Sequence, residues 1–434
     1  MAKSVAIVGA GIAGLAAAHF LKRKGWDVTV FEASQRIGGA IHSEKIDGFT
    51  LEWGPNTVLL NTRGIKELIL SAGLWDHMIF SNPDSAKSRY IADGVLKQIP
   101  TSPTQFLTTS LLSLKSKLGL LKEPFLNSYE STDNPSVEVF AKKRFGKEFY
   151  ENILQPFVTG IYAGDASAIS VKYGLKLLWR AEQESGSVFR GLMKQGKKVK
   201  AENKIFTKAI PKNKMFTFNG GLATLCQSLA EEIDVKLGEK PSKTLLDTFD
   251  KVIYTGKPSG ITEYFDNAFL KTQLNNIPMS SVSVLHLGFN SKDLPELPNG
   301  FGALTKENSK DHFLGILFSS KIFPHVSAAE QELLTVIIGG QRNPDYVNWS
   351  KEEAIEYILA DLKKYTKVQG DPIFTNYIVQ KDAIPQYHLN HQDLLDEIEK
   401  FEQSNPKYHI MSNFVRGISV GDCVQKVYEL TLNW

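Results

Sequence analysis

Three glycines near the start of the chain have the spacing of a turn that binds phosphate. Gly9, Gly11 and Gly14 follow a short apolar run, residues 4–8, and precede a stretch rich in Ala and Leu. The first glycine permits a tight turn, the second lets backbone N–H groups approach a pyrophosphate, and the third lets a helix pack closely on a strand. The N-terminus of that helix favours an anion. The spacing therefore predicts a dinucleotide-binding site.

Glu32 ends a second apolar run, residues 27–32, and completes a strand–helix–strand pattern over residues 4–32. Its carboxylate can accept hydrogen bonds from both ribose hydroxyls, and it would repel a 2′-phosphate. We therefore expect the nucleotide to be FAD or NAD, and not NADP.

The residues after Glu32 choose between FAD and NAD. Arg36 supplies a fixed positive charge for the pyrophosphate, and Gly38 and Gly39 let the backbone approach the ligand. A further segment contains Gly54, Pro55 and Asn56. Together these segments resemble the flavin amine oxidase superfamily, in which Glu-Ala-x-x-Arg-x-Gly-Gly is followed by a Gly-Pro segment beside the flavin. The resemblance implies FAD, and the alternative for Arg36 is a solvated surface charge.

The last part of the chain extends this resemblance. Residues 412–424 are similar to the superfamily's C-terminal flavin motif, in which a helix N-terminus faces the pyrimidine end of the ring, and this implies a cofactor contact at Val420. Val235 is similarly implied to contact the adenine side, although residues 221–260 are shorter than in relatives. Cys423 lies away from the position that tethers flavin in some amine oxidases, and we expect it to be a buried packing residue. We therefore expect non-covalent FAD.

Other segments resemble protoporphyrinogen oxidases more closely than monoamine or polyamine oxidases. They are residues 54–56, 89–100, 157–165, 182–187 and 384–387. This resemblance implies transfer of hydride to FAD from a carbon that bridges electron-rich pyrroles, with molecular oxygen as the electron acceptor. Such a reaction needs orientation and a dry cavity, so no catalytic side chain is expected.

The same resemblance implies the substrate contacts. Arg89 matches an Arg that would hold a propionate as a bidentate pair, and Gly160 and Gly164 match positions where backbone approaches the tetrapyrrole. The alternatives are a surface salt bridge at Arg89 and ordinary loop glycines at the other two positions.

Several functions stay open at this point. The substrate is protoporphyrinogen or coproporphyrinogen, and the chain could also be another flavin amine oxidase, acting on a polyamine or a carotenoid. An alternative of a different class is a non-catalytic scaffold that binds FAD.

The length of 434 residues predicts two or three domains in a multidomain α/β (α+β) fold. We expect a Rossmann-like FAD-binding domain, formed by residues 1–85, 212–258 and 381–434. We expect an antiparallel sheet to form the substrate-binding domain, from residues 86–100 and 259–380, because strand-like runs recur there. A helical domain, residues 101–211, is expected as an insertion.

Residues 106–125 of this insertion are rich in Leu, and before Glu123 their only charges are lysines. A helix here would be cationic and amphipathic, which suits an anionic membrane surface or the mouth of an apolar tunnel. Packing into the core is equally compatible with the pattern. Because no apolar run is long enough to span a membrane and no signal peptide precedes residue 4, we expect a cytoplasmic protein, with any membrane contact being peripheral and at the inner face.

The composition argues against other classes. Lys and Arg number 50 against 47 Asp and Glu, so the overall charge predicts no nucleic-acid partner. Cys226 and Cys423 have neither metal-binding nor disulfide spacing. His388 and His391 lack a carboxylate motif and are expected to be loop or cap residues, so no metal site is expected.

Overall fold

The computed structural model describes residues 3–203, 214–264 and 267–434, which form two compact units. Unit 1 contains residues 1–80, 214–278 and 390–434. Unit 2 contains residues 81–213 and 279–389.

Unit 1 is built on a parallel sheet of five strands in the order β10-β2-β1-β11-β17. The strands are β1 (Ser4–Val8), β2 (Asp27–Glu32), β10 (Asp234–Leu237), β11 (Lys251–Tyr254) and β17 (Tyr408–Ile410). Parallel neighbours need a crossover connection, and α1 (Ile12–Lys22) supplies it between β1 and β2. The predicted strand–helix–strand unit is therefore confirmed.

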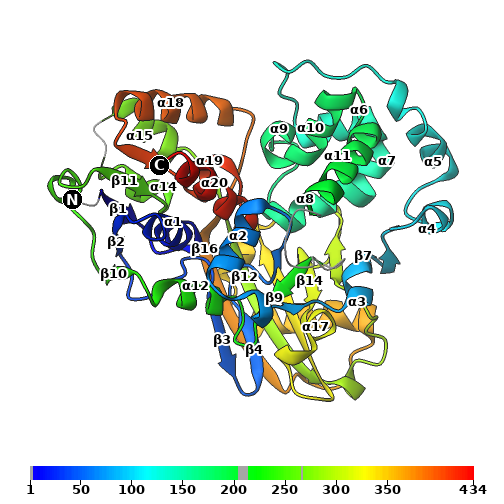
Figure 1. Ribbon diagram of the computed structural model, residues 1–434. Coiled ribbons are helices and arrows are strands. Elements are labelled where there is room, and N and C mark those ends of the chain that lie inside the picture. Colours follow the sequence, from blue (N-terminus) through cyan, green and yellow to red (C-terminus); the bar gives the residue numbers. More distant parts are fainter. Residues whose placement is uncertain (1–2, 204–213, 265–266) are drawn as a thin grey trace. The chain divides into compact units, whose positions relative to one another are not determined.

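Helices lie on both faces of this sheet (Figure 1). On one face, α1 contacts α12 (Ala223–Ala230) and α20 (Val420–Leu432). On the other face, α15 (Ala268–Asn275) and α18 (His391–Ser404) close an apolar cluster with the strands. Because both faces are covered, the central strand β1 is largely apolar and buried, whereas the edge strand β10 is mostly exposed.

Two small antiparallel sheets complete unit 1. The hairpin of β3 (Ser43–Ile46) and β4 (Phe49–Glu52) starts a few residues after the paired glycines. The other sheet has the order β5-β9-β6, formed by β5 (Val58–Leu59), β9 (Met215–Thr217) and β6 (Ile79–Phe80). Next to it in the chain, α2 (Arg63–Ser71) packs on α20.

Unit 2 contains a sheet of seven strands in the order β16-β12-β15-β14-β13-β7-β8. The strands are β7 (Arg89–Asp93), β8 (Val95–Gln98), β12 (Met279–Asn290), β13 (Gly302–Thr305), β14 (Gly315–Phe318), β15 (Gln331–Gly339) and β16 (Phe374–Pro385). All neighbours are antiparallel except β13 and β7, which are parallel. The predicted antiparallel sheet is present and contains this one parallel pair: β7 and β8 come from a distant part of the chain, so no tight turn fixes their direction relative to β13.

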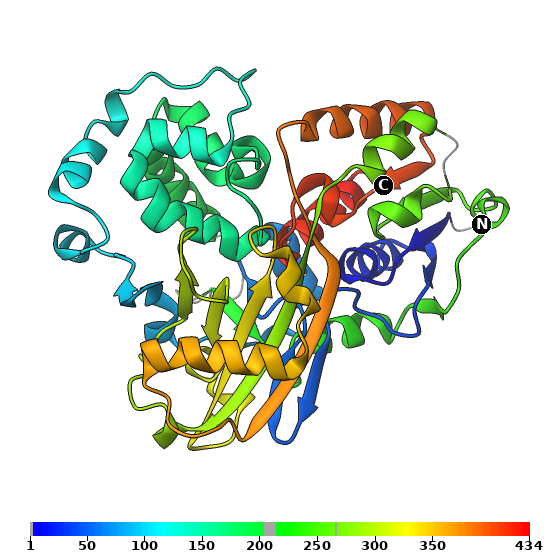
Figure 2. The same ribbon diagram turned by 180° about the vertical axis from the view of Figure 1, so that it is seen from behind.

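One face of this sheet is covered by α17 (Lys351–Thr366), which crosses it in the view of Figure 2. The helix starts at a capping box on Ser350 and places Ala354, Ile358 and Leu362, at a spacing of four residues, on the sheet. The other face receives α8 (Gln155–Tyr162), which packs on β13. This second face carries Arg89, because its neighbour Tyr90 points to the α17 side.

Most of the other helices of unit 2 come from the predicted insertion, whereas α3 (Pro83–Lys87) and α16 (Ser319–Ile322) lie outside it. The insertion contributes α4 (Pro103–Thr108), α5 (Leu114–Leu120), α6 (Val137–Phe145), α7 (Lys147–Phe149), α9 (Val171–Gly174), α10 (Lys176–Ser185) and α11 (Val188–Asn203). Residues 106–125 do not form one continuous helix: α4 ends at Thr108, Ser113 caps α5 at the Ser116 N–H, and a short 3-10 helix follows at Glu123–Phe125. No helix in the described ranges is long and apolar enough to cross a membrane.

The unit boundaries differ from the predicted domain boundaries. Residues 259–278 belong to unit 1 because α15 packs on α18, and residues 381–389 belong to unit 2 because β16 extends to Pro385. The described helices of residues 101–203 share unit 2 with the sheet. The division into three functional domains stays a prediction, and its boundary residues 212 and 213 lie outside the described residues.

Candidate functional site

Close backbone contacts hold the glycine turn at the end of β1. Gly9 has a φ of +110° and donates its N–H to a carbonyl of β2 at 2.7 Å. A Cβ on Gly14 would lie 1.9 Å from the Gly9 carbonyl oxygen, so only glycine lets α1 pack this closely. Gly11 lies against Gly39 and forms a bridge with Gly38. We call this set of five predicted residues the glycine cradle (Gly9, Gly11, Gly14, Gly38 and Gly39).

Glu32 lies beside the cradle, at the end of β2. Its carboxylate accepts hydrogen bonds from the backbone N–H groups of Ala10, at 2.8 Å, and Ser34, at 2.9 Å. An ionised carboxylate has about four acceptor positions, so these two bonds leave capacity for ribose hydroxyls.

The other predicted residues of this region meet at the loop that contains Gly38 and Gly39. The Arg36 guanidinium donates to the carbonyl oxygen of Gly39 at 2.8 Å. A Cβ on Gly54 would lie 2.1 Å from the carbonyl oxygen of Ala40, so this segment rests against the loop. Pro55 follows, and Asn56 Nδ2 donates to the Gly54 carbonyl oxygen at 3.0 Å. The structure therefore brings residues 36–40 and 54–56 together.

The cradle fits the pyrophosphate of a dinucleotide. The N-terminus of α1 has no side-chain cap in the described structure and no acid in its first turn, which leaves its N–H groups for an anion. A Cβ on Gly11 would meet only Gly39 within 4 Å, so there is space beside the turn. Arg36 would add positive charge and Glu32 would hold the ribose.

Val235 and Val420 also lie in unit 1. Val235 is in the edge strand β10, in register with Val30 of β2. Val420 is the first residue of α20, which is capped by Ser419: its Oγ accepts the N–H of Asp422 at 3.0 Å. Their contacts with a cofactor stay predictions.

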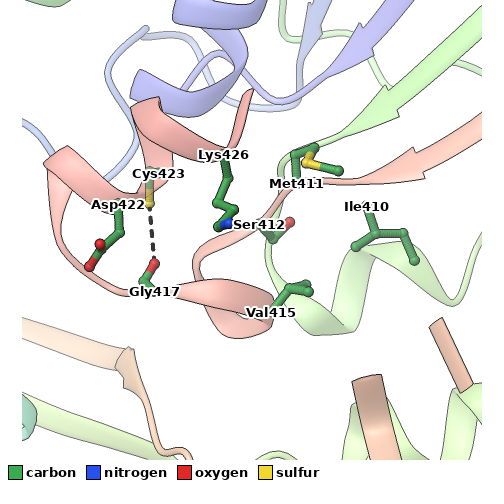
Figure 3. A pocket seen from close by; sticks show the side chains of 8 residues that line it. All are labelled: Ile410, Met411, Ser412, Val415, Gly417, Asp422, Cys423 and Lys426. Atoms are coloured by element: carbon green, nitrogen blue, oxygen red, sulfur yellow. Dashed lines mark hydrogen bonds between the residues drawn. The ribbon is translucent and has the colours of Figure 1, made fainter. Parts of the chain in front are cut away.

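A small pocket lies between the end of β17 and the start of α20 (Figure 3). It is lined by Ile410, Met411, Ser412, Val415, Gly417, Asp422, Cys423 and Lys426. A Cβ on Gly417 would lie 2.4 Å from the side chain of Asp422, so the backbone turns tightly here. Cys423 is buried and contacts the Gly417 carbonyl oxygen at 3.5 Å, which confirms the expected packing role. The pocket lies within the segment predicted to face the flavin.

Sequence reasoning missed Glu52, which the structure buries beside the cradle. Its carboxylate accepts hydrogen bonds from Ser43 Oγ and from the backbone N–H of Leu222, both at 2.7 Å. Burial is the largest influence on this carboxyl group and raises its pKa to about 8, against the hydrogen bonds, which lower it. The sequence signal for Glu52 was an acid at the end of a short strand, and the structure shows that all four residues of this strand are buried.

Arg89 is a partly buried cation on β7 of unit 2. Its guanidinium lies 4.7 Å from the ring centre of Phe301. Burial lowers the pKa of Arg89. Among the described residues, no carboxylate counteracts this effect. Arg89 therefore forms no salt bridge with any described residue, although a surface salt bridge was the alternative to substrate binding.

Gly160 and Gly164 are in close contact with other parts of unit 2. A Cβ on Gly160 would lie 2.7 Å from the side chain of Leu304, so glycine lets α8 pack on β13. A Cβ on Gly164 would lie 2.0 Å from Gln386 Oε1, and Gln386 Nε2 donates to the Tyr162 carbonyl oxygen at 2.9 Å. Both glycines thus have a packing role, and their contact with substrate stays a prediction.

The two histidines have local roles. His391 starts α18 and its Nε2 lies 3.1 Å from the Val415 carbonyl oxygen. His388 forms a backbone bridge with Ile169, and burial lowers its pKa. Over residues 3–203, 214–264 and 267–434, no three His, Cys, Asp or Glu side chains are grouped to hold a metal ion.

Comparison with known proteins gives consistent matches along the chain. A family model described as flavin containing amine oxidoreductase matches residues 12–405. Protoporphyrinogen oxidase 2 of Arabidopsis thaliana is 32% identical over 97% of this chain and 92% of its own length. Coproporphyrinogen III oxidase of Bacillus subtilis is 26% identical over 98% of this chain and 96% of its own. A crystal structure from Exiguobacterium sp. 255-15, named as a protoporphyrinogen oxidase, has a TM-score of 0.80 at 22% identity, with both chains fully covered.

Proposed function

We propose, from the premise that this chain belongs to the flavin containing amine oxidoreductase family, that it oxidises protoporphyrinogen IX to protoporphyrin IX in heme biosynthesis. The chain is a flavin-dependent oxidoreductase. The cofactor in this proposal is non-covalent FAD, and molecular oxygen is the electron acceptor. When bound, the flavin supplies the hydride acceptor.

The chain's own contribution would be binding and orientation. The glycine cradle and Glu32 would hold the nucleotide part of FAD through backbone N–H groups and one carboxylate. Neither described unit contains a grouped metal site, and the chemistry requires no strong base, because the pyrrole N–H protons can pass to weak acceptors.

Arg89 is the observation that carries the substrate assignment. A partly buried cation without a resolved carboxylate partner is costly unless an anion joins it. Next to it on the same sheet face, cross-strand pairing aligns Ile91 with Leu304, on which α8 packs at Gly160. A guanidinium at the border of such an apolar interior would suit an apolar macrocycle that carries carboxylates.

We also propose that residues 106–125 bind peripherally to the inner face of an anionic membrane, from the cytoplasm. Five large apolar side chains of this segment are exposed: Leu107 71%, Leu114 73%, Leu118 57%, Leu121 69% and Phe125 80%. Lys115, Lys117 and Lys122 lie among them. Exposed apolar residues with lysines favour a membrane surface over the core alternative.

A porphyrin fluorescence assay with both porphyrinogens tests the substrate assignment. We expect the turnover of protoporphyrinogen to exceed that of coproporphyrinogen. Faster oxidation of coproporphyrinogen would make the four-propionate substrate correct, as in the Bacillus subtilis relative. If the chain oxidises polyamines but neither porphyrinogen, its activity would be that of the other amine oxidases.

A further inference from the structure

Glu52 lies behind the glycine cradle and connects two parts of unit 1. It ends β4, and one of its oxygens accepts the N–H of Leu222, the residue that precedes α12. The other oxygen accepts the hydroxyl of Ser43, which in turn accepts the N–H of Ala223 at 2.9 Å. Glu52 and Ser43 therefore connect the β3–β4 hairpin to the first turn of α12 by hydrogen bonds.

The segment that follows the β3–β4 hairpin and helix α12 both lie against the loop from Gly38 to Ala40, which we call the cradle loop. On one side, a Cβ on Gly38 would lie 3.8 Å from the Cβ of Cys226, which belongs to α12. On the other side, Gly54 lies two residues after Glu52 and rests on the carbonyl of Ala40. The loop from Gly38 to Ala40 is thus enclosed by two elements that Glu52 joins.

Glu52 and Ser43 are closely packed against Gly221. Gly221 has a φ of +78°, and a Cβ there would lie 2.5 Å from Ser43 and 2.7 Å from Glu52 Oε1. The Glu52 side chain is 9% exposed. Among the described titratable groups, Cys226 is influenced by Glu52: burial and then Glu52 raise the pKa of Cys226, whereas Arg36 lowers it.

We propose that Glu52 is a positioning residue for the flavin cofactor, which through its hydrogen bonds to Ser43 and Leu222 holds α12 and Gly54 against the cradle loop. Ionisation would place a charge in a site that is closed to water, and the simplest relief is separation of the hairpin from α12. The cradle loop would then lose both of its supports. The proposal rests on the proposed FAD site, but not on the identity of the substrate.

The test is the dissociation constant of added FAD for the cofactor-free full chain, measured by flavin fluorescence between pH 6 and pH 9.5. Because burial raises the pKa of Glu52 to about 8, the constant should rise about tenfold between pH 7 and pH 9, at one decade for each unit above the pKa. Glu52→Gln should bind FAD with a nearly constant affinity over this range. Glu44→Gln, which removes an exposed carboxylate from the same hairpin, should keep the wild-type profile.

A wild-type profile in Glu52→Gln would overturn the proposal, and so would a wild-type affinity that does not change up to pH 9.5. Ser43→Ala provides a second variant if Glu52→Gln does not fold. The Ser43 hydrogen bond lowers the pKa of Glu52, so its removal should move the midpoint to higher pH. An unchanged midpoint would contradict the role of Glu52. Failure of the porphyrinogen assay would leave this titration unaffected, whereas a chain that binds no FAD at neutral pH would refute both the cofactor proposal and this one.

Discussion

Replacement of Arg89 by Ala separates substrate orientation from cofactor binding and from folding. The guanidinium is partly buried and its carbon lies 4.7 Å from the centre of the Phe301 ring. No carboxylate among the described residues counteracts the lowering of its pKa by burial. Its removal should delete charge-assisted hydrogen bonds to a propionate, worth about 1.5 to 3 kcal/mol. This corresponds to roughly one to two decades in kcat/KM. Stability should change little, because loss of a cation–π contact worth about 0.5 to 1 kcal/mol is offset by relief of a poorly solvated charge.

The assay is steady-state oxidation of protoporphyrinogen, with flavin occupancy and thermal unfolding measured on the same preparations. Arg89→Lys should recover only part of the loss, since a point charge replaces a planar fork. Lys87→Ala, which removes an exposed cation two residues earlier, is the matched control and should keep wild-type kinetics. Wild-type kcat/KM in Arg89→Ala would remove this residue from the substrate site. Lost flavin would assign it to the cofactor site.

Three further predictions concern the cofactor, the buried carboxyl group and the exposed helices. Glu32→Ala should lower FAD occupancy, and acid precipitation of the wild type should release all flavin; flavin in the precipitate would refute the non-covalent site. Because the folded pKa of Glu52 is raised to about 8, the folded state holds this proton more tightly than the unfolded state, so the free energy of unfolding should fall as pH rises from about 4.5 to 8, by roughly 3 to 5 kcal/mol in total. Glu52→Gln should lack this decline in chemical denaturation, and an equal decline in both proteins would contradict the burial effect. The double variant Leu118→Glu and Leu121→Glu should bind anionic vesicles at least about tenfold more weakly in flotation, since each buried Leu is worth about 1.5 to 3 kcal/mol; Leu432→Glu, at another exposed leucine, should bind as the wild type does.

The strand–helix–strand unit and its glycine turn could be predicted because their residues are local in sequence. Gly9 has a positive φ and Gly14 has no space for a side chain, and glycine at these positions is visible in residue type alone. Glu32 follows at the end of the next strand of the same strand–helix–strand unit. Local spacing was therefore sufficient.

Contacts between distant segments could not be predicted in this way. Glu52 and Leu222 are 170 residues apart, and only the fold shows that a strand end meets a helix start. Gly160 and Gly164 were assigned to close approach, but spacing did not reveal that Leu304 and Gln386 lie there. Apolar content in residues 106–125 likewise did not distinguish Leu120, which is buried, from its exposed neighbours.

Anaerobic mixing of the flavin-loaded chain with protoporphyrinogen tests the central claim most directly. The flavin absorbance should bleach before porphyrin fluorescence develops, because each flavin accepts one hydride per cycle and the porphyrin needs several cycles; admission of oxygen should restore the oxidised spectrum and let the fluorescence appear. Putrescine under the same conditions is the control and should leave the flavin oxidised. A flavin that stays oxidised with both protoporphyrinogen and coproporphyrinogen, in protein that retains bound FAD, would contradict the proposed porphyrinogen oxidation; if amines also fail to reduce it, the non-catalytic scaffold is the better account.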